Sequence, residues 1–185
     1  TVSPQVSLYK VTGDNYVFTH AYLNGVGNIN TTRPASSAYN KNMQTQADLI
    51  ANYTKSYGNH AFEAMGGFSY FQRYIYGFNA SGQGAATDLI PTLNASSTPV
   101  SVNGNETIFA MVGYFSRLNY NYAQKYLLSL TARYDGASNL GANYRWGFFP
   151  GVSVGWNMHK EDFFANAQPY LSTLKLRASY GVNGN

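Results

Sequence analysis

Apolar and charged side chains keep to opposite sides of a period-two pattern along much of this chain, and no other feature limits the possible folds as strongly. From Trp146 to Trp156 every second residue is apolar, and the residues between them are glycine or serine except for Phe149. This alternation is typical of a β-strand with one apolar face. The same pattern predicts strands over residues 44–57, 61–73, 107–122, 125–135, 146–156 and 173–181.

The charges in these segments separate the two faces. The apolar side carries one charged residue, Lys55, which lies beside the turn signal Gly58-Asn59. The opposite side carries Asp48, Glu63, Arg73, Arg117, Lys125, Arg133, Asp135, Lys175 and Arg177. A charge facing the middle of a bilayer costs about 2–4 kcal/mol, so lipid against the apolar face explains this separation. Alternation alone also fits a soluble β-sandwich, in which a second sheet covers the apolar face.

The two tryptophans indicate the height of the apolar face. Trp146 and Trp156 share that face, and their separation corresponds to about 33 Å along an extended strand. A strand tilt of about 40° reduces this to about 25 Å, the height of the apolar band between the aromatic girdles of an outer-membrane barrel. We therefore expect one girdle with Tyr120, Tyr122, Tyr126 and Trp156, and a second with Tyr134 and Trp146.

Composition argues against several other classes of protein. Charged residues make up 11% of the chain, against about 25% in typical soluble domains. No apolar run approaches the roughly 18 residues of a membrane-spanning helix. Cysteine is absent, and the net charge of +4 is spread along the chain, without the basic block that a nucleic-acid groove needs.

The residues that usually carry catalysis or bind metals are scattered. His20, His60 and His159 lie in different segments and lack the spacing of a metal site. Glu161 and Asp162 form an acidic pair without an accompanying nucleophile, and the electrostatics of a helix start explain them. We therefore expect no enzyme activity, no cofactor and no metal.

The predicted connections alternate in length. Residues 58–60 and 123–124 form short turns, whereas 75–106 and 136–145 form longer loops. Outer-membrane barrels combine short periplasmic turns with longer outer loops. The connection 158–172 is longer than a usual periplasmic turn, and we expect a short helical turn within it, near residues 161–165.

Two local features complete the prediction. Residues 1–43 are assigned to an outer-loop or hairpin region, with a hairpin around residues 12–15, and residues 44–185 to barrel strands and loops. Pro150 lies inside a predicted strand and is followed by Gly151. Because proline cannot donate a ladder hydrogen bond, this pair predicts a bulge.

Several stretches between residues 114 and 185 carry a resemblance. They are "RLNYNY", "KYLL", "RWGFFPG", "GW" and "LKLRASYGVNGN". In these stretches and their order the chain resembles the SusC/RagA family, TonB-dependent nutrient transporters of the outer membrane in Bacteroidetes. Tyr134 stands where a second arginine often follows Arg133, and "ASNLG" replaces the usual "SSRFG". These departures lie in loops or at strand ends, so they change the residues available for loop contacts and leave the barrel prediction intact.

The resemblance implies an all-β fold, an antiparallel transmembrane β-barrel of about 22 strands with a plugged lumen. This chain would supply about six to eight of those strands. The implied partners are outer-membrane lipid, a SusD-like lipoprotein lid, and TonB acting through a plug domain that is absent from these residues. The implied cargo is an oligosaccharide or a peptide. Because open strand edges in lipid leave backbone groups unpaired, we do not expect this segment to insert alone.

Four basic residues are the candidates for substrate binding in the lumen. They are Arg117, Arg133, Lys175 and Arg177. One interpretation is that they pair internally with Glu63, Asp48, Asp135 or plug carboxylates; the other is that they guide an anionic or polar solute. Aromatic residues of the outer loops could stack on sugar rings, namely Tyr39, Tyr76, Phe78 and Tyr144.

Two alternative functions stay open at this point. A passive porin or adhesin barrel would show the same strands without a plug domain. A soluble, secreted β-sandwich that binds carbohydrate would show the same alternation, with its apolar face covered by a second sheet.

Overall fold

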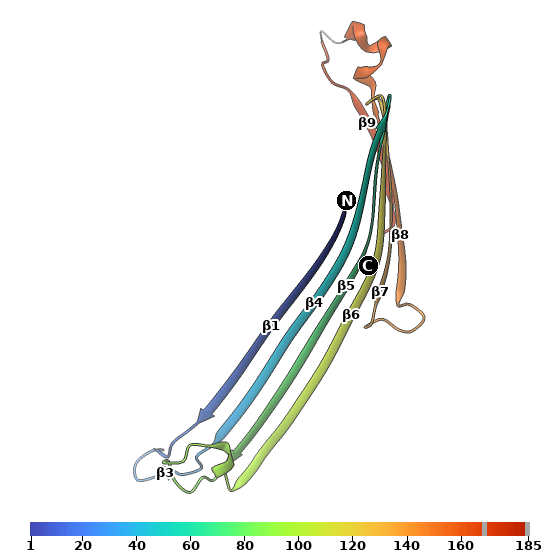
Figure 1. Cartoon of the computed structure of the whole chain (residues 1–185). Coiled ribbons are helices and arrows are strands. Elements are labelled where there is room, and N and C mark those ends of the chain that lie inside the picture. Colours follow the sequence, from blue (N-terminus) through green and yellow to red (C-terminus); the bar gives the residue numbers. More distant parts are fainter. Residues whose placement is uncertain (168–169, 184–185) are drawn as a thin grey trace. The chain divides into compact units, whose positions relative to one another are not determined.

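One antiparallel sheet contains nearly all of the regular structure (Figure 1). The computed structural model describes residues 1–167 and 170–183. The strand order is β1-β4-β5-β6-β7-β8-β9, so long strands that follow one another in sequence are hydrogen-bonded neighbours. The strands are β1 (Val2–Phe18), β4 (Ala35–Tyr57), β5 (His60–Gln83), β6 (Thr98–Tyr122), β7 (Tyr126–Ala137), β8 (Trp146–Asn157) and β9 (Lys175–Gly181). The predicted all-β, antiparallel fold is confirmed, and its open sheet has seven strands.

The remaining elements are short and lie in the connections. β2 (Tyr22–Leu23) pairs with β3 (Ile29–Asn30). The 3-10 helices are η1 (Leu93–Ala95), η2 (Met158–Lys160) and η3 (Asp162–Ala167), and η3 confirms the helical turn predicted near residues 161–165. Among the described residues, no helix has both the length and the apolar character needed to cross a membrane.

The chain divides into two compact units. The first unit contains residues 1–7, 45–71 and 109–185, and the second contains residues 8–44 and 72–108. β7, β8 and β9 belong wholly to the first unit, whereas β2, β3 and η1 belong to the second.

In the first unit, the pairing of β6 to β9 collects apolar residues into continuous rows. One row contains Leu118, Leu130, Val152 and Tyr180, and the next contains Tyr120, Leu128, Val154 and Ala178. Successive side chains of a strand point to opposite faces, so the residues between these belong to the other face. The period-two prediction of two distinct faces is therefore confirmed for these strands.

The apolar face is not covered by a second layer within the described residues. Val152 is 39% exposed, Phe148 58% and Leu176 53%. The buried hydrophobic residues in the described part of the chain are Ala35, Ala80, Ala85 and Phe164. A β-sandwich would bury the apolar faces of two sheets against each other. The single layer therefore contradicts the β-sandwich alternative.

The prediction of a loop over residues 75–106 is wrong. β5 continues to Gln83, β6 already begins at Thr98, and only residues 84–97 connect them. In the same way, β4 begins at Ala35, earlier than its period-two pattern indicates. The second unit is thus built largely from strand extensions that the sequence suggested were loops.

Cross-strand pairing explains why these polar segments form strands. Asn103 Nδ2 donates to Asn79 Oδ1 at 3.3 Å, and the hydroxyl groups of Ser81 and Ser101 lie 2.7 Å apart. Each of these pairs joins β5 to β6. Strand preference depends on such cross-strand partners, which cannot be read from one segment alone.

The predicted hairpin around residues 12–15 is also wrong, because β1 runs without interruption to Phe18. The reversal occurs later, between β2 and β3. There Gly25 and Gly27 have φ of 94° and 74°, and the Asn24 amide donates to Asn28 O at 2.7 Å. Glycine takes such left-handed conformations readily, so these two glycines supply the turn that Gly13 does not.

The predicted bulge at Pro150 is absent, since β7 and β8 stay paired through Ala132–Pro150 and Thr131–Gly151. The carbonyl of Pro150 accepts a hydrogen bond from the Val182 amide at 3.0 Å. In an antiparallel sheet, the backbone N and C=O of one residue point toward the same neighbouring strand. The ring nitrogen of Pro150 therefore faces the β9 side, so the ladder between β7 and β8 loses no donor.

Candidate functional site

The polar face of the first unit is the side of β6 to β9 opposite the apolar rows, and its residues are mostly small or hydrophilic. Its paired rows are Arg117-Thr131-Gly151-Gly181, Asn119-Ser129-Ser153-Ser179 and Asn121-Leu127-Gly155-Arg177. Glycine and serine leave the backbone of a sheet open to close approach by another molecule. The middle of the polar face is consequently a low floor of hydroxyl groups and backbone.

Hydrogen bonds link this floor to a carboxylate on β5. Ser129 Oγ donates to Asn119 Oδ1 at 2.7 Å, and Asn119 Nδ2 donates to Glu63 Oε2 at 3.4 Å. An open hollow of about 560 Å³ lies over these residues and is also lined by Lys175 and Arg177.

The structure places the four predicted substrate-binding residues on the polar face but in different environments. Arg133 Nε lies 2.6 Å from Asp135 Oδ2 and is therefore paired within its own strand. Lys175 and Arg177 line the hollow together, while Arg117 borders an adjacent hollow of about 400 Å³. Internal pairing is thus found for Arg133, and a role of any of the four in substrate binding stays a prediction.

The apolar face carries aromatic residues at both ends, in the two groups that the sequence predicted. At one end, Tyr122 and Tyr126 stack with their ring centroids 6.3 Å apart, and Tyr126 and Trp156 stack at 6.4 Å. At the other end, Tyr134 and Trp146 stack at 4.8 Å. The apolar rows lie between these two aromatic groups.

Glu161 joins the connection after β8 to the aromatic group at Trp156. Its Oε2 accepts from Lys125 Nζ at 2.9 Å and its Oε1 accepts from Trp156 Nε1 at 3.0 Å. These two hydrogen bonds, with a further one from Tyr126, lower the pKa of Glu161 to about 2. The helix-start explanation for this residue was incomplete, because the partner Lys125 lies on a different turn and no local pattern pointed to it.

A strained turn lies beside this carboxylate. Ala123 and Gln124 have φ of 50° and 56°, a left-handed conformation that costs non-glycine residues about 1–2 kcal/mol each. Their backbone is held from two sides. The Ala123 amide donates to Asn59 O at 2.6 Å, and Asn157 Nδ2 donates to Gln124 O at 2.6 Å. These contacts fix the turn in a conformation that its sequence does not favour.

We predict that replacing Glu161 with glutamine weakens the acid dependence of stability. The pKa of Glu161 is lowered from 4.5 to about 2 in the folded protein. Its stabilising contribution is therefore present above pH 4.5 and is lost as the pH falls from 4.5 through about 2. Melting temperatures, followed by tryptophan fluorescence over this range, should fall more steeply for the natural protein than for Glu161→Gln. Equal slopes would contradict the role of Glu161.

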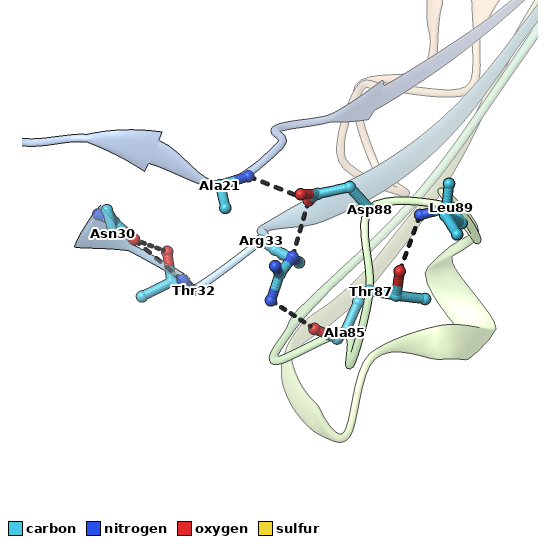
Figure 2. Close-up of polar contacts among 8 residues, drawn as sticks. All are labelled: Ala21, Asn30, Thr32, Arg33, Ala85, Thr87, Asp88 and Leu89. Atoms are coloured by element: carbon cyan, nitrogen blue, oxygen red, sulfur yellow. Dashed lines mark hydrogen bonds and ion pairs between the residues drawn. The ribbon is translucent and has the colours of Figure 1, made fainter.

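In the second unit, the connections before β4 and after β5 meet at Asp88 (Figure 2). Asp88 Oδ1 accepts from Arg33 Nε at 2.7 Å and from the Ala21 amide at 3.0 Å, while Arg33 Nη1 donates to Ala85 O at 3.3 Å. The hydrogen bond from Arg33, followed by that from Ala21, lowers the pKa of Asp88. Arg33 has a φ of 45°, so its ion pair holds a conformation that a non-glycine residue before proline rarely adopts.

The aromatic residues predicted to contact sugar lie partly on strands and not in loops. Tyr39 on β4 and Tyr76 on β5 have ring centroids 6.2 Å apart, and Phe78 follows on β5. Tyr144 lies in the β7–β8 connection and is 80% exposed. Contact of these rings with a sugar stays a prediction. Among the described residues, no three His, Asp or Glu side chains are grouped as metal ligands would be.

An antiparallel sheet with a bare apolar face between two aromatic groups and a polar opposite face is the architecture of a β-barrel wall. No family model matches the chain. The TonB-dependent receptor P3 of Formosa agariphila is 36% identical over 155 residues, which are 82% of this chain and 15% of that protein. TonB-dependent receptor SusC of Bacteroides thetaiotaomicron is 32% identical over 137 residues, which are 74% of this chain and 13% of that protein. The chain belongs to the TonB-dependent receptors.

Solved structures support the fold. The structure of the RagAB peptide transporter superposes with a TM-score of 0.77 at 20% sequence identity, covering 97% of this chain and 20% of that one. The resemblance to the SusC/RagA family found in the sequence is confirmed by the 32% identity to SusC over 74% of this chain. This chain spans only 13–15% of the length of the curated relatives described above. These relatives and neighbours are receptors and transporters, not enzymes.

Proposed function

We propose that this chain forms part of the wall of an outer-membrane, TonB-dependent importer that takes up an oligosaccharide or a peptide. The observation that carries the proposal is the exposed apolar face between two aromatic groups, combined with a charged and hydroxyl-rich opposite face. In a barrel wall the apolar face contacts lipid and the polar face lines the lumen. The proposal is supported by the similarity to TonB-dependent receptors and by the shared fold with the RagAB peptide transporter.

The proposed partner on the outer side is a SusD-like lipoprotein. The connections of the second unit expose apolar side chains, with Leu23 73% and Leu89 88% exposed. The hydrogen bonds of Asp88 hold these connections in one arrangement. Exposed apolar residues on an ordered surface are typical of protein contacts. Energy would come from TonB, acting through a plug domain supplied elsewhere in the full-length protein.

Growth and uptake in cells test the importer proposal. We expect a deletion of the full-length gene to abolish growth on at least one mixture of oligosaccharides or peptides offered as sole carbon source. Loss of TonB function should have the same effect, because import against a gradient needs energy. Uptake that needs the gene but not TonB would favour a passive porin, and uptake that needs neither would contradict the proposal.

A further inference from the structure

Lys55 places a positive charge on the apolar side of β4, and the proposed wall leaves that charge without a partner. It lies near the end of β4, just before the two-residue turn of Gly58 and Asn59 that leads into β5. The side chain is exposed, and it forms no ion pair with a carboxylate within the described residues. An ammonium group at the edge of an apolar face needs water or an external anion beside it.

The residues across the hairpin from Lys55 form an aromatic patch. A two-residue turn fixes the register of a hairpin, so Phe62 on β5 lies opposite Lys55. The ring centroid of Phe62 lies 4.8 Å from that of Tyr120, and the ring centroid of His60 lies 4.8 Å from that of Tyr122. Tyr122 belongs to one of the two aromatic groups at the ends of the apolar face. Lys55 therefore lies at the level of an aromatic girdle, where lipid head groups meet acyl chains.

His60 supplies a second hydrogen-bond donor beside Lys55. His60 Nδ1 lies 2.8 Å from the hydroxyl oxygen of Tyr120. A neutral imidazole has one donor and one acceptor nitrogen, so Nε2 carries the hydrogen when Nδ1 accepts from the hydroxyl group. The hydrogen bonds found among the described residues include none from Nε2. The neighbouring carboxylates in sequence, Asp48 and Glu63, alternate to the opposite face. The patch thus offers donors without an anion of its own.

We propose that Lys55 and His60 bind the phosphate group of a glycerophospholipid whose acyl chains lie along the apolar face. The proposal rests on the proposed barrel wall, in which the short turns face the periplasm and the lipid belongs to the periplasmic leaflet. Tyr53 and Tyr57 share the face of Lys55 on β4 and are 59% and 80% exposed. Exposed rings beside a cation suit an amphipathic ligand better than a soluble anion. Charge-assisted hydrogen bonds to phosphate are strong.

Lipid retention by the purified full-length receptor tests the proposal. The receptor is stripped of lipid in detergent and incubated with phosphatidylglycerol, and native mass spectrometry counts the lipid that stays bound. We expect several-fold less retention of a diacylglycerol that has the same chains but no phosphate. Lys55→Gln should lower the retention of phosphatidylglycerol several-fold at an unchanged melting temperature, and Lys55→Arg should keep most of it. Lys10→Gln removes the same charge from β1 in the second unit and, as the matched control, should leave retention unchanged.

Three results would overturn the proposal. The first is equal retention of phosphatidylglycerol by the natural protein and Lys55→Gln. The second is equal retention of phosphatidylglycerol and diacylglycerol, since the phosphate would then not be recognised. The third is displacement of the lipid by inorganic phosphate, which would make the patch a site for a soluble anion. Arginine substitutions on the apolar face test the wall separately, so failure of the lipid site would leave the proposed wall standing.

Discussion

Val152→Arg is expected to destabilise the full-length protein by about 2–4 kcal/mol, since it places a charge near the middle of the lipid-facing band. Val152 lies on the apolar face between Leu130 and Tyr180, and it is 39% exposed. On β8 it is close to midway between Trp146 and Trp156, the residues that belong to the two aromatic groups. A long basic side chain at this depth reaches neither interface easily. Urea unfolding of the receptor in lipid vesicles measures the change.

Leu176→Arg is the matched control for this substitution. Leu176 lies on the same face but pairs with Trp156, so it belongs to the level of one aromatic group. There an arginine can extend its head group into the water, and the expected cost falls to about 0–1 kcal/mol. Equal effects at Val152 and Leu176 would mean that the apolar face does not meet a bilayer of this thickness, and the wall assignment would fail.

Gly67→Ala is expected to cost about 1–3 kcal/mol, because a methyl group at this position meets backbone as well as side chain. A Cβ on Gly67 would lie 2.8 Å from the carbonyl oxygen of Leu49 and in closer conflict with the ring of Phe115. The ring could rotate away, whereas the carbonyl belongs to the neighbouring strand and cannot move without disturbing the ladder. Samples heated to increasing temperatures are run on a gel, and the temperature at which the band of folded protein disappears measures the change in stability.

Gly66→Ala is the control for this second substitution, since it alters the adjacent residue of the same strand. The nearest atom to a Cβ on Gly66 is Phe115 O, at 4.0 Å, so the methyl group fits without displacement. We expect this variant to melt close to the natural protein. If both variants melt at the same temperature, the contacts of Leu49 O and the Phe115 ring with Gly67 do not limit the stability of the protein.

The two faces of the sheet were predictable because alternation is a local property. Each strand residue points opposite to the one before it, so the alternation of Leu128 and Leu130 with Ser129 and Thr131 already shows which face is apolar. The aromatic groups at Trp146 and Trp156 followed from the same spacing. β7, β8 and β9 accordingly begin and end within a few residues of the predicted segments.

The strand extensions of the second unit were not predictable in this way. These segments are rich in glycine, asparagine and serine, a composition typical of loops. They form strands through cross-strand partners such as Asn79 with Asn103. Pro150 shows the same limit from the opposite side. The sequence shows that Pro150 has no backbone N–H to donate, but it does not show which neighbouring strand this position faces. The strand pairing shows that it faces β9.

The candidate site divides along the same line. The sequence by itself determined that Arg117, Arg133, Lys175 and Arg177 share a polar face, because their positions follow the two-residue period of the strands. Only the tertiary structure decided that Arg133 is paired with Asp135, that Lys175 and Arg177 border one hollow, and that Glu161 binds both Lys125 and Trp156. The physical reason is distance along the chain. The face of the sheet on which a side chain lies depends only on its position in the local two-residue alternation. Its hydrogen-bond and ion-pair partners depend on the strand order and register of the whole sheet.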